Sequence, residues 1–114
     1  MGWIGVDLDR TLAYYDTWRG LDHIGEPIPL MLRNVKAMLS EGLDVRIFTA
    51  RVSETGPDGY VYNPPLARKA IEAWCLEHIG RVLPITNVKD FEMTALYDDR
   101  AYHVIPNTGI IVAE

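Results

Sequence analysis

The amino-acid sequence predicts an α/β fold built on a parallel β-sheet. Short apolar segments with the character of strands alternate with longer segments whose apolar residues recur at helical spacing. Such alternation is typical of parallel sheets with right-handed crossovers. Pairs of acidic residues follow two of the apolar segments, at the sheet edge where parallel α/β proteins bind ligands. We expect the 114 residues to form one domain, residues 1–114.

The first half of the chain predicts a strand, a helix and a second strand. Residues 3–8 are almost continuously apolar, as in a central strand that is buried on both faces. Residues 27–41 carry apolar side chains at helical spacing, and Gly42 stands where a left-handed residue commonly ends a helix. Residues 43–48 then alternate with a period of two, which indicates the second strand.

The second half predicts another helix and three more strands. Asn63 followed by Pro64 and Pro65 is typical of a helix start, because asparagine caps the first N–H groups and proline needs no N–H there. Apolar residues line one face of this helix up to Gly80, which ends it. The remaining strands are expected at residues 81–86, 94–97 and 102–105, with a turn at residues 106–109.

The charge and composition of the chain argue against several classes of function. The net charge of −5 gives no general attraction to nucleic acids or membrane surfaces. No apolar run is long enough to cross a bilayer, and no signal-peptide pattern opens the chain. Cys75 is the single cysteine, so an intrachain disulfide is impossible and a reducing compartment is favoured. We therefore expect a cytoplasmic protein without a membrane partner.

Two pairs of acidic residues are the most informative feature of the sequence. Asp7 and Asp9 follow the first expected strand, and Asp98 and Asp99 follow the fourth. Carboxylates near the ends of buried strands are unfavourable unless something compensates them, and a divalent cation with oxygen ligands is the usual compensation. The two pairs can therefore converge on one metal ion. The alternative is that these acids are capping or solvated residues at strand ends.

A carboxylate cluster of this kind can carry out phosphoryl transfer. Asp7 could attack phosphorus to give an aspartyl phosphate, and Asp9 could protonate the leaving group and then activate water. Mg²⁺ would bridge Asp7, a phosphate oxygen and Asp98. Thr49, at the end of the second strand, could hydrogen-bond a phosphoryl oxygen, and Lys89 could neutralise its charge. Taken singly, Thr49 and Lys89 are more typical of turn and surface positions.

Four motifs occur in the order found in a known superfamily. They are Asp7-Leu8-Asp9-Arg10-Thr11-Leu12, Phe48-Thr49-Ala50-Arg51, Lys89 and Asp98-Asp99. In these residues the chain resembles the haloacid dehalogenase (HAD) superfamily of phosphohydrolases, and the resemblance spans residues 3–100. It implies a Rossmann-like three-layer sandwich with a parallel five-stranded sheet in the order 5-4-1-2-3.

The resemblance also implies a role for each motif residue. Asp7 would be the nucleophile and Asp9 the general acid/base. Asp7, Asp98 and the main-chain carbonyl of Asp9 would bind Mg²⁺. Asp99 would either belong to the metal site or orient Lys89. Substrate contacts are expected from four further residues, namely Arg10, Thr11, Ala50 and Arg51.

Three arginines within or next to the motifs raise separate questions. The family usually has glycine where this chain has Arg10, so we expect the turn geometry there to be altered. Arg51 and Arg100 could contact a phosphate or could pair with the acids, and the sequence leaves both interpretations open.

The spacing of the motifs leaves no room for an inserted cap domain. About 40 residues separate Asp9 from Thr49, and a similar number separate Thr49 from Lys89, whereas domains rarely fall below about 50 residues. The resemblance therefore implies a capless member with an open site. Two loops, residues 13–26 and 52–63, could partly close it, and so could a homo-oligomer.

The expected function is therefore Mg²⁺-dependent hydrolysis of a phosphomonoester. The substrate would be a small phosphorylated molecule, such as a nucleotide, or a phosphorylated nucleic-acid end, because loop aromatics such as Trp18 could stack on a base. Two alternatives remain. One is a protein phosphatase, and the other is a catalytically silent module that binds phosphate or metal on the same scaffold.

Overall fold

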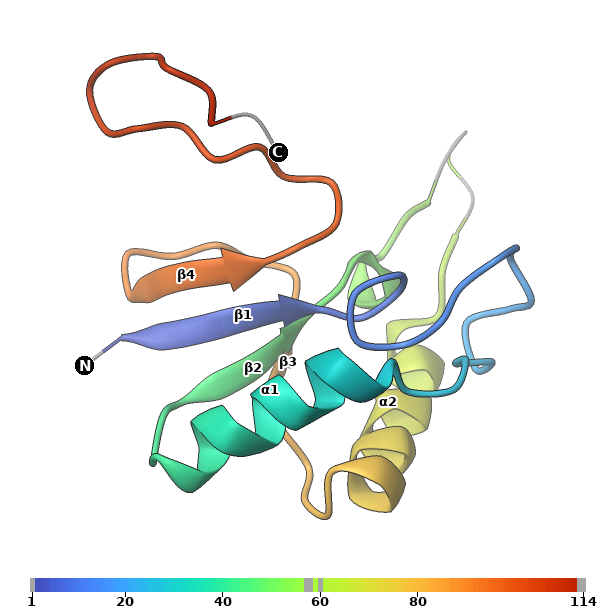
Figure 1. Ribbon diagram of the computed structural model, residues 1–114. Coiled ribbons are helices and arrows are strands. Elements are labelled where there is room, and N and C mark those ends of the chain that lie inside the picture. Colours follow the sequence, from blue (N-terminus) through green and yellow to red (C-terminus); the bar gives the residue numbers. More distant parts are fainter. Residues whose placement is uncertain (1, 57–58, 60, 113–114) are drawn as a thin grey trace.

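The chain forms a parallel four-stranded β-sheet with helices in its crossovers (Figure 1). The computed structural model describes residues 2–56, 59 and 61–112. The strand order is β3-β2-β1-β4, and every pairing is parallel. The strands are β1 (Trp3–Asp7), β2 (Val45–Phe48), β3 (Ile85–Thr86) and β4 (Met93–Tyr97). The predicted α/β class and parallel sheet are confirmed.

In the described part of the chain, the connections between the strands contain the α-helices α1 and α2 and the short 3₁₀ helix η1. Helix α1 spans Pro29–Ser40, and helix α2 spans Pro64–His78. The side chain of Asn63 accepts a hydrogen bond from the N–H of Leu66 at 3.2 Å, which confirms the predicted helix cap. The 3₁₀ helix η1 (Ala50–Val52) directly follows β2. None of the helices in the described part of the chain is long and apolar enough to cross a membrane.

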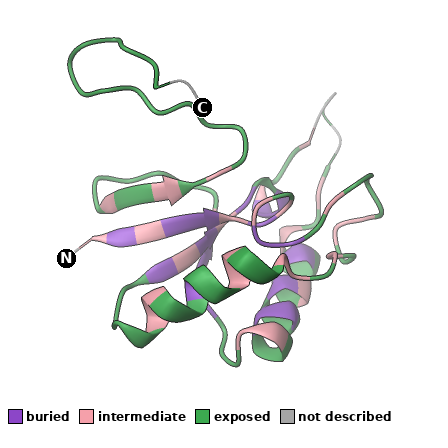
Figure 2. Cartoon of the chain, viewed as in Figure 1, coloured by how far each residue is buried: buried purple, intermediate pink, exposed green. Residues whose placement is uncertain are grey.

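One hydrophobic core joins both helices to the same face of the sheet. Val6 and Ile47 of the two central strands are fully buried, and so are Val35 of α1 and Ile71 of α2. All four belong to one cluster of buried side chains. Figure 2 shows buried positions in purple on the central strands and on both helices. Right-handed crossovers from β1 to β2 and from β2 to β3 place both helices on one side.

The other face of the sheet has a thin cover, so the predicted three-layer sandwich is wrong for the described residues. Trp3 is 1% exposed, yet no described helix packs over it. Its ring lies under Arg46, with 4.8 Å from the guanidinium carbon to the ring centroid, and its indole N–H donates to Asp90 at 2.8 Å. The connection of residues 87–92 between β3 and β4 is too short to hold the helix of a third layer.

The predicted fifth strand at residues 102–105 is also wrong. This segment folds back on residues 110–112 through the predicted turn at residues 106–109. The Ile105 N–H donates to the Ile110 carbonyl at 2.9 Å, and the Val112 N–H donates to the His103 carbonyl at 2.8 Å. The strand-forming residues 102–105 therefore pair with a neighbouring segment of the chain and not with the sheet. They form an exposed hairpin that projects from the sheet (Figures 1 and 2).

The third strand is shorter than the predicted range of residues 81–86. Only Ile85 and Thr86 pair with β2 as a strand. Pro84 has no N–H to donate, although its carbonyl accepts a hydrogen bond from the N–H of Ile47 at 2.8 Å. Proline thus limits regular pairing at this edge of the sheet.

Candidate active site

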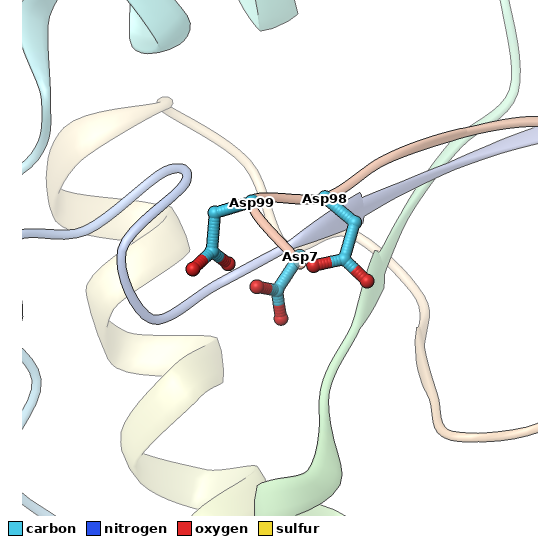
Figure 3. Close-up of side chains that lie close together, drawn as sticks. All are labelled: Asp7, Asp98 and Asp99. Atoms are coloured by element: carbon cyan, nitrogen blue, oxygen red, sulfur yellow. The ribbon is translucent and has the colours of Figure 1, made fainter. Parts of the chain in front are cut away.

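Three carboxylates meet at the carboxyl edge of the sheet. Asp7 ends β1, while Asp98 and Asp99 follow β4 directly. Val6 pairs with Tyr97 in these neighbouring parallel strands, so the chain continues into both acidic segments at the same level. One oxygen from each carboxylate lies within 4.8 Å of the other two (Figure 3). The structure therefore brings together three of the four predicted acidic residues.

The carboxylate cluster changes the proton affinity of Asp7. Burial raises the pKa of Asp7 to about 7, and the hydrogen bond to Asp99 and the negative charges of Asp98 and Asp99 act in the same direction. For Asp99, burial acts to raise the pKa, but hydrogen bonds from Asp7 and Thr11 and the charge of Arg10 lower it. The cluster thus favours a bound proton or cation at neutral pH.

Thr11 ties the two acidic segments together. Its hydroxyl lies 3.4 Å from Oδ2 of Asp7 and 3.3 Å from Oδ1 of Asp99, and it accepts the N–H of Asp99 at 3.1 Å. Thr11 was expected to contact substrate. The structure shows it orienting the carboxylates, a role that the sequence spacing did not indicate, and its substrate contact stays a prediction.

The turn after β1 places Thr11 and is built around one carbonyl group. The Leu8 carbonyl accepts hydrogen bonds from the N–H groups of Thr11, Leu12 and Ala13. Arg10 adopts a φ of 73°, which is the left-handed conformation that glycine adopts most easily. The turn predicted to be altered by Arg10 therefore takes a conformation suited to glycine, and the exposed Arg10 Nε lies 3.5 Å from Asp99.

The carboxylate oxygens at this edge are suitable ligands for a divalent cation. Carboxylate oxygens are the ligands that Mg²⁺ prefers, and ligands on opposite sides of such cations lie about 4–5 Å apart. Oδ1 of Asp98 accepts the N–H of Arg100 at 3.0 Å, which orients that carboxylate. Asp7, Asp98 and Asp99 would hold the ion. The side chain of Asp9 is not part of this group.

Asp9 forms a bidentate ion pair with Arg51 instead. Nε and Nη2 of Arg51 donate to the two carboxylate oxygens at 2.8 and 2.9 Å. Strand β1 ends at Asp7, so Asp9 lies within the turn, where strand alternation no longer sets its direction. Of the two interpretations of Arg51, the structure shows pairing with an acid. For Arg100, the structure shows a hydrogen bond from its main-chain N–H to Oδ1 of Asp98.

Thr49 and Ala50 lie at the same edge, after β2. Phe48 pairs with Asp7, so Thr49 follows one position beyond the nucleophile candidate on the neighbouring strand. The Thr49 side chain is buried and accepts the N–H of Arg51 at 3.2 Å, which leaves its hydroxyl hydrogen for another acceptor. Ala50 begins η1 and is exposed.

Lys89 is not brought to the carboxylates. It lies in the exposed connection between β3 and β4 and forms no hydrogen bond or ion pair with any residue that the structure describes. Its role as the motif lysine therefore remains a prediction that this arrangement does not support.

Two loops approach each other beside the site. Trp18 stacks on Tyr62, with ring centroids 6.0 Å apart and planes 9° apart. The Arg51 guanidinium carbon lies 5.2 Å from the centroid of the Trp18 ring. These contacts join the predicted loops of residues 13–26 and 52–63. Residues 57, 58 and 60 of the second loop lie outside the described residues.

Comparison with known proteins supports the fold. The chain is similar to a solved structure of a conserved protein from Bacteroides thetaiotaomicron, with a TM-score of 0.57 and 22% sequence identity. The similarity covers 86% of this chain and 75% of that protein. At this identity it shows a shared fold alone. No protein-family description and no curated protein matches the sequence.

Proposed function

We propose that this protein is a capless, HAD-type phosphomonoester hydrolase that requires Mg²⁺. The observation that carries the proposal is the cluster of Asp7, Asp98 and Asp99 at the carboxyl edge of a parallel sheet. Ligands bind at this edge in open α/β folds. The order of the four motifs supports the same assignment. We also propose a cytoplasmic location, because the single cysteine excludes an intrachain disulfide.

The proposed chemistry proceeds through an aspartyl phosphate. Mg²⁺ would neutralise the carboxylate cluster and the phosphate, so that two anionic groups can approach. An oxygen of Asp7 forms a bond to phosphorus as the bond to the leaving oxygen breaks, and the leaving oxygen takes a proton from Asp9. Water then attacks phosphorus and gives a proton to Asp9, which releases phosphate and restores Asp7. Thr49 would donate its hydroxyl hydrogen to a phosphoryl oxygen.

The proposed substrate is a nucleotide or a phosphorylated nucleic-acid end. Its support is the aromatic pair of Trp18 and Tyr62 in the loops beside the site. Base–aromatic stacking contributes about 1–3 kcal/mol per base. Ala50 would contact the phosphate through the main chain of η1. A homo-oligomer that covers the open site is a further proposal.

The pairing of Asp9 favours a second candidate function. Both carboxylate oxygens of Asp9 accept hydrogen bonds from Arg51, so proton transfer requires at least one of these bonds to open. The exposed Lys89 forms no ion pair with the described acids. A catalytically silent module that binds metal and phosphate would tolerate both features.

The experiment that tests the proposal is phosphate release from a panel of phosphomonoesters, with Mg²⁺ and with a chelator. The panel contains nucleotides, sugar phosphates, a 3′-phosphorylated oligonucleotide and a phosphopeptide. We expect release that the chelator stops and that Asp98→Asn shifts to higher Mg²⁺ concentration. Metal binding measured by calorimetry without release from any substrate would favour the silent module. Preference for the phosphopeptide would favour a protein phosphatase.

A further inference from the structure

Arg51 is a buried arginine whose donors are nearly all engaged within the protein. Its side chain is 4% exposed. Besides the two hydrogen bonds to Asp9, its Nη1 donates to the main-chain carbonyls of Gly20 and Leu21 at 3.0 and 2.9 Å. A guanidinium group has five N–H donors, and four are used here. Arg51 is therefore poorly placed to bind a substrate phosphate.

The contacts of Arg51 join three segments of the chain. Asp9 belongs to the turn after β1, Gly20 and Leu21 belong to the loop before α1, and Arg51 itself lies in η1 after β2. The N–H of Arg51 is fixed by the Thr49 hydroxyl. Because one planar guanidinium group joins all three segments, a movement of any of them changes the bonds to the others.

Leu21 and Ile24 of the loop around Gly20 pack against the hydrophobic core, and Trp18 stacks on Tyr62, but the loop has few other polar contacts with the rest of the described chain. The His23 N–H donates to the Gly20 carbonyl, and Arg19 pairs with Asp16, so both contacts stay within the loop. The exposed Trp18 rests near the Arg51 guanidinium. Arg51 is thus the main polar anchor of residues 16–24.

We infer that Arg51 is a positioning residue that couples Asp9 to the loop of residues 16–24. The orientation of the Asp9 carboxylate and the position of the loop change together, because the same guanidinium holds both. The inference rests on the proposed function only where it treats Asp9 as the general acid/base. The coupling itself rests on the contacts described above.

The planar fork of arginine is what makes this coupling possible. A lysine ammonium keeps the positive charge, but it is a compact group with three donors and cannot form two parallel bonds to a carboxylate while it binds two carbonyls. Arg51→Lys therefore removes the geometry and retains the charge. Asp9→Asn replaces one acceptor oxygen with a donor that faces the guanidinium, and so weakens the same link from the other end.

Amide hydrogen exchange measured by mass spectrometry tests the coupling directly. In Arg51→Lys and in Asp9→Asn, we expect exchange in residues 16–24 to be at least about tenfold faster, while α2 exchanges as in the native chain. Arg19→Lys is the matched control, because its ion pair is local to the loop and exposed, and it should leave exchange unchanged. Native-like loop exchange in either Arg51→Lys or Asp9→Asn would overturn the inference.

Steady-state kinetics separates positioning from substrate binding. With a phosphomonoester that the native chain hydrolyses, Arg51→Lys should lower kcat by about 100-fold and change KM by less than about threefold. A loss confined to KM would show that Arg51 binds substrate, which contradicts the positioning role. If the native chain hydrolyses no phosphomonoester, the proposed function fails, and the exchange measurement still decides whether Asp9 and the loop are coupled.

Discussion

At the scale of single residues, the carboxyl group of Asp7 has the most unusual surroundings. It is partly buried and shares a small volume with two other acids, so its ionised form is disfavoured. A divalent cation would relieve the same repulsion that a proton relieves. The metal-free protein should therefore be sensitive to pH at this position.

The contribution of Asp7 to the stability of the metal-free chain should fall as the pH rises. The pKa of Asp7 is raised from 3.8 to about 7, so the folded state binds more protons between these values than the unfolded state does. This contribution is fully present below about pH 4, declines as the pH rises and is lost above about pH 7. Thermal unfolding with a chelator should show a Tm at pH 8 that is higher in Asp7→Asn than in the native chain. Equal Tm values would contradict the assignment, and Mg²⁺ should raise the Tm of the native chain alone.

Arg10 has a strained backbone conformation that the contacts of its side chain do not explain. Its φ of 73° is unfavourable for an L-amino acid with a Cβ, and its ion pair with Asp99 is solvent-exposed and contributes little. The turn keeps this conformation because the Leu8 carbonyl collects three N–H groups. Residues on either side of Arg10 therefore determine its conformation.

Glycine should be preferred over alanine at position 10. Arg10→Gly and Arg10→Ala both remove the ion pair, so the difference between them reports the φ preference alone. We expect the glycine variant to be about 1 kcal/mol more stable in urea unfolding. The native protein should lie close to the alanine variant. An alanine variant as stable as the glycine variant would show that the turn relaxes to a negative φ.

At the scale of elements, the N-terminal cap of α2 depends on one side-chain hydrogen bond, so a single substitution tests it. Asn63→Ala removes the acceptor for the Leu66 N–H and should lower stability by about 1 kcal/mol. The matched control is Asn34→Ala at an exposed position inside α1, which should leave stability unchanged or raise it slightly, because alanine is the better helix former. A similar loss in both variants would remove the argument for a specific cap.

The elements that sequence reasoning predicted well are those whose signals are local. The order of β1, α1, β2, α2, β3 and β4 follows from apolar periodicity and from the prolines and glycines at helix ends. The order of the neighbouring strands placed Asp7 beside Asp98 and Asp99, so the acidic edge of the site followed from topology.

The parts that could not be predicted depend on side-chain contacts between distant loops. The pair of Asp9 and Arg51 joins residues 42 positions apart, and no spacing rule indicates which acid an arginine will meet.

The prediction of a fifth strand was wrong for a different reason. Tyr102-His103-Val104-Ile105 has strong β character, but the turn beside it offered a nearer pairing partner than β4.

At the scale of the whole molecule, most of the buried side chains lie on one side of the sheet. The two helices and the central strands share a single core, whereas residues 101–112 are exposed and bond among themselves. A chain that ends after Arg100 should therefore lose less than about 0.5 kcal/mol of stability in urea unfolding, since no core contact is removed. A much larger loss would show that the hairpin contacts the sheet in solution.

The measurement that tests the central claim most directly is the rate of phosphate release by the native chain and by Asp7→Asn, with Mg²⁺ and the best substrate of the panel. We predict Mg²⁺-dependent release by the native chain and a loss of about 1,000-fold or more in Asp7→Asn, whose circular dichroism should match the native spectrum. Release that is unchanged in a folded Asp7→Asn variant would contradict the account.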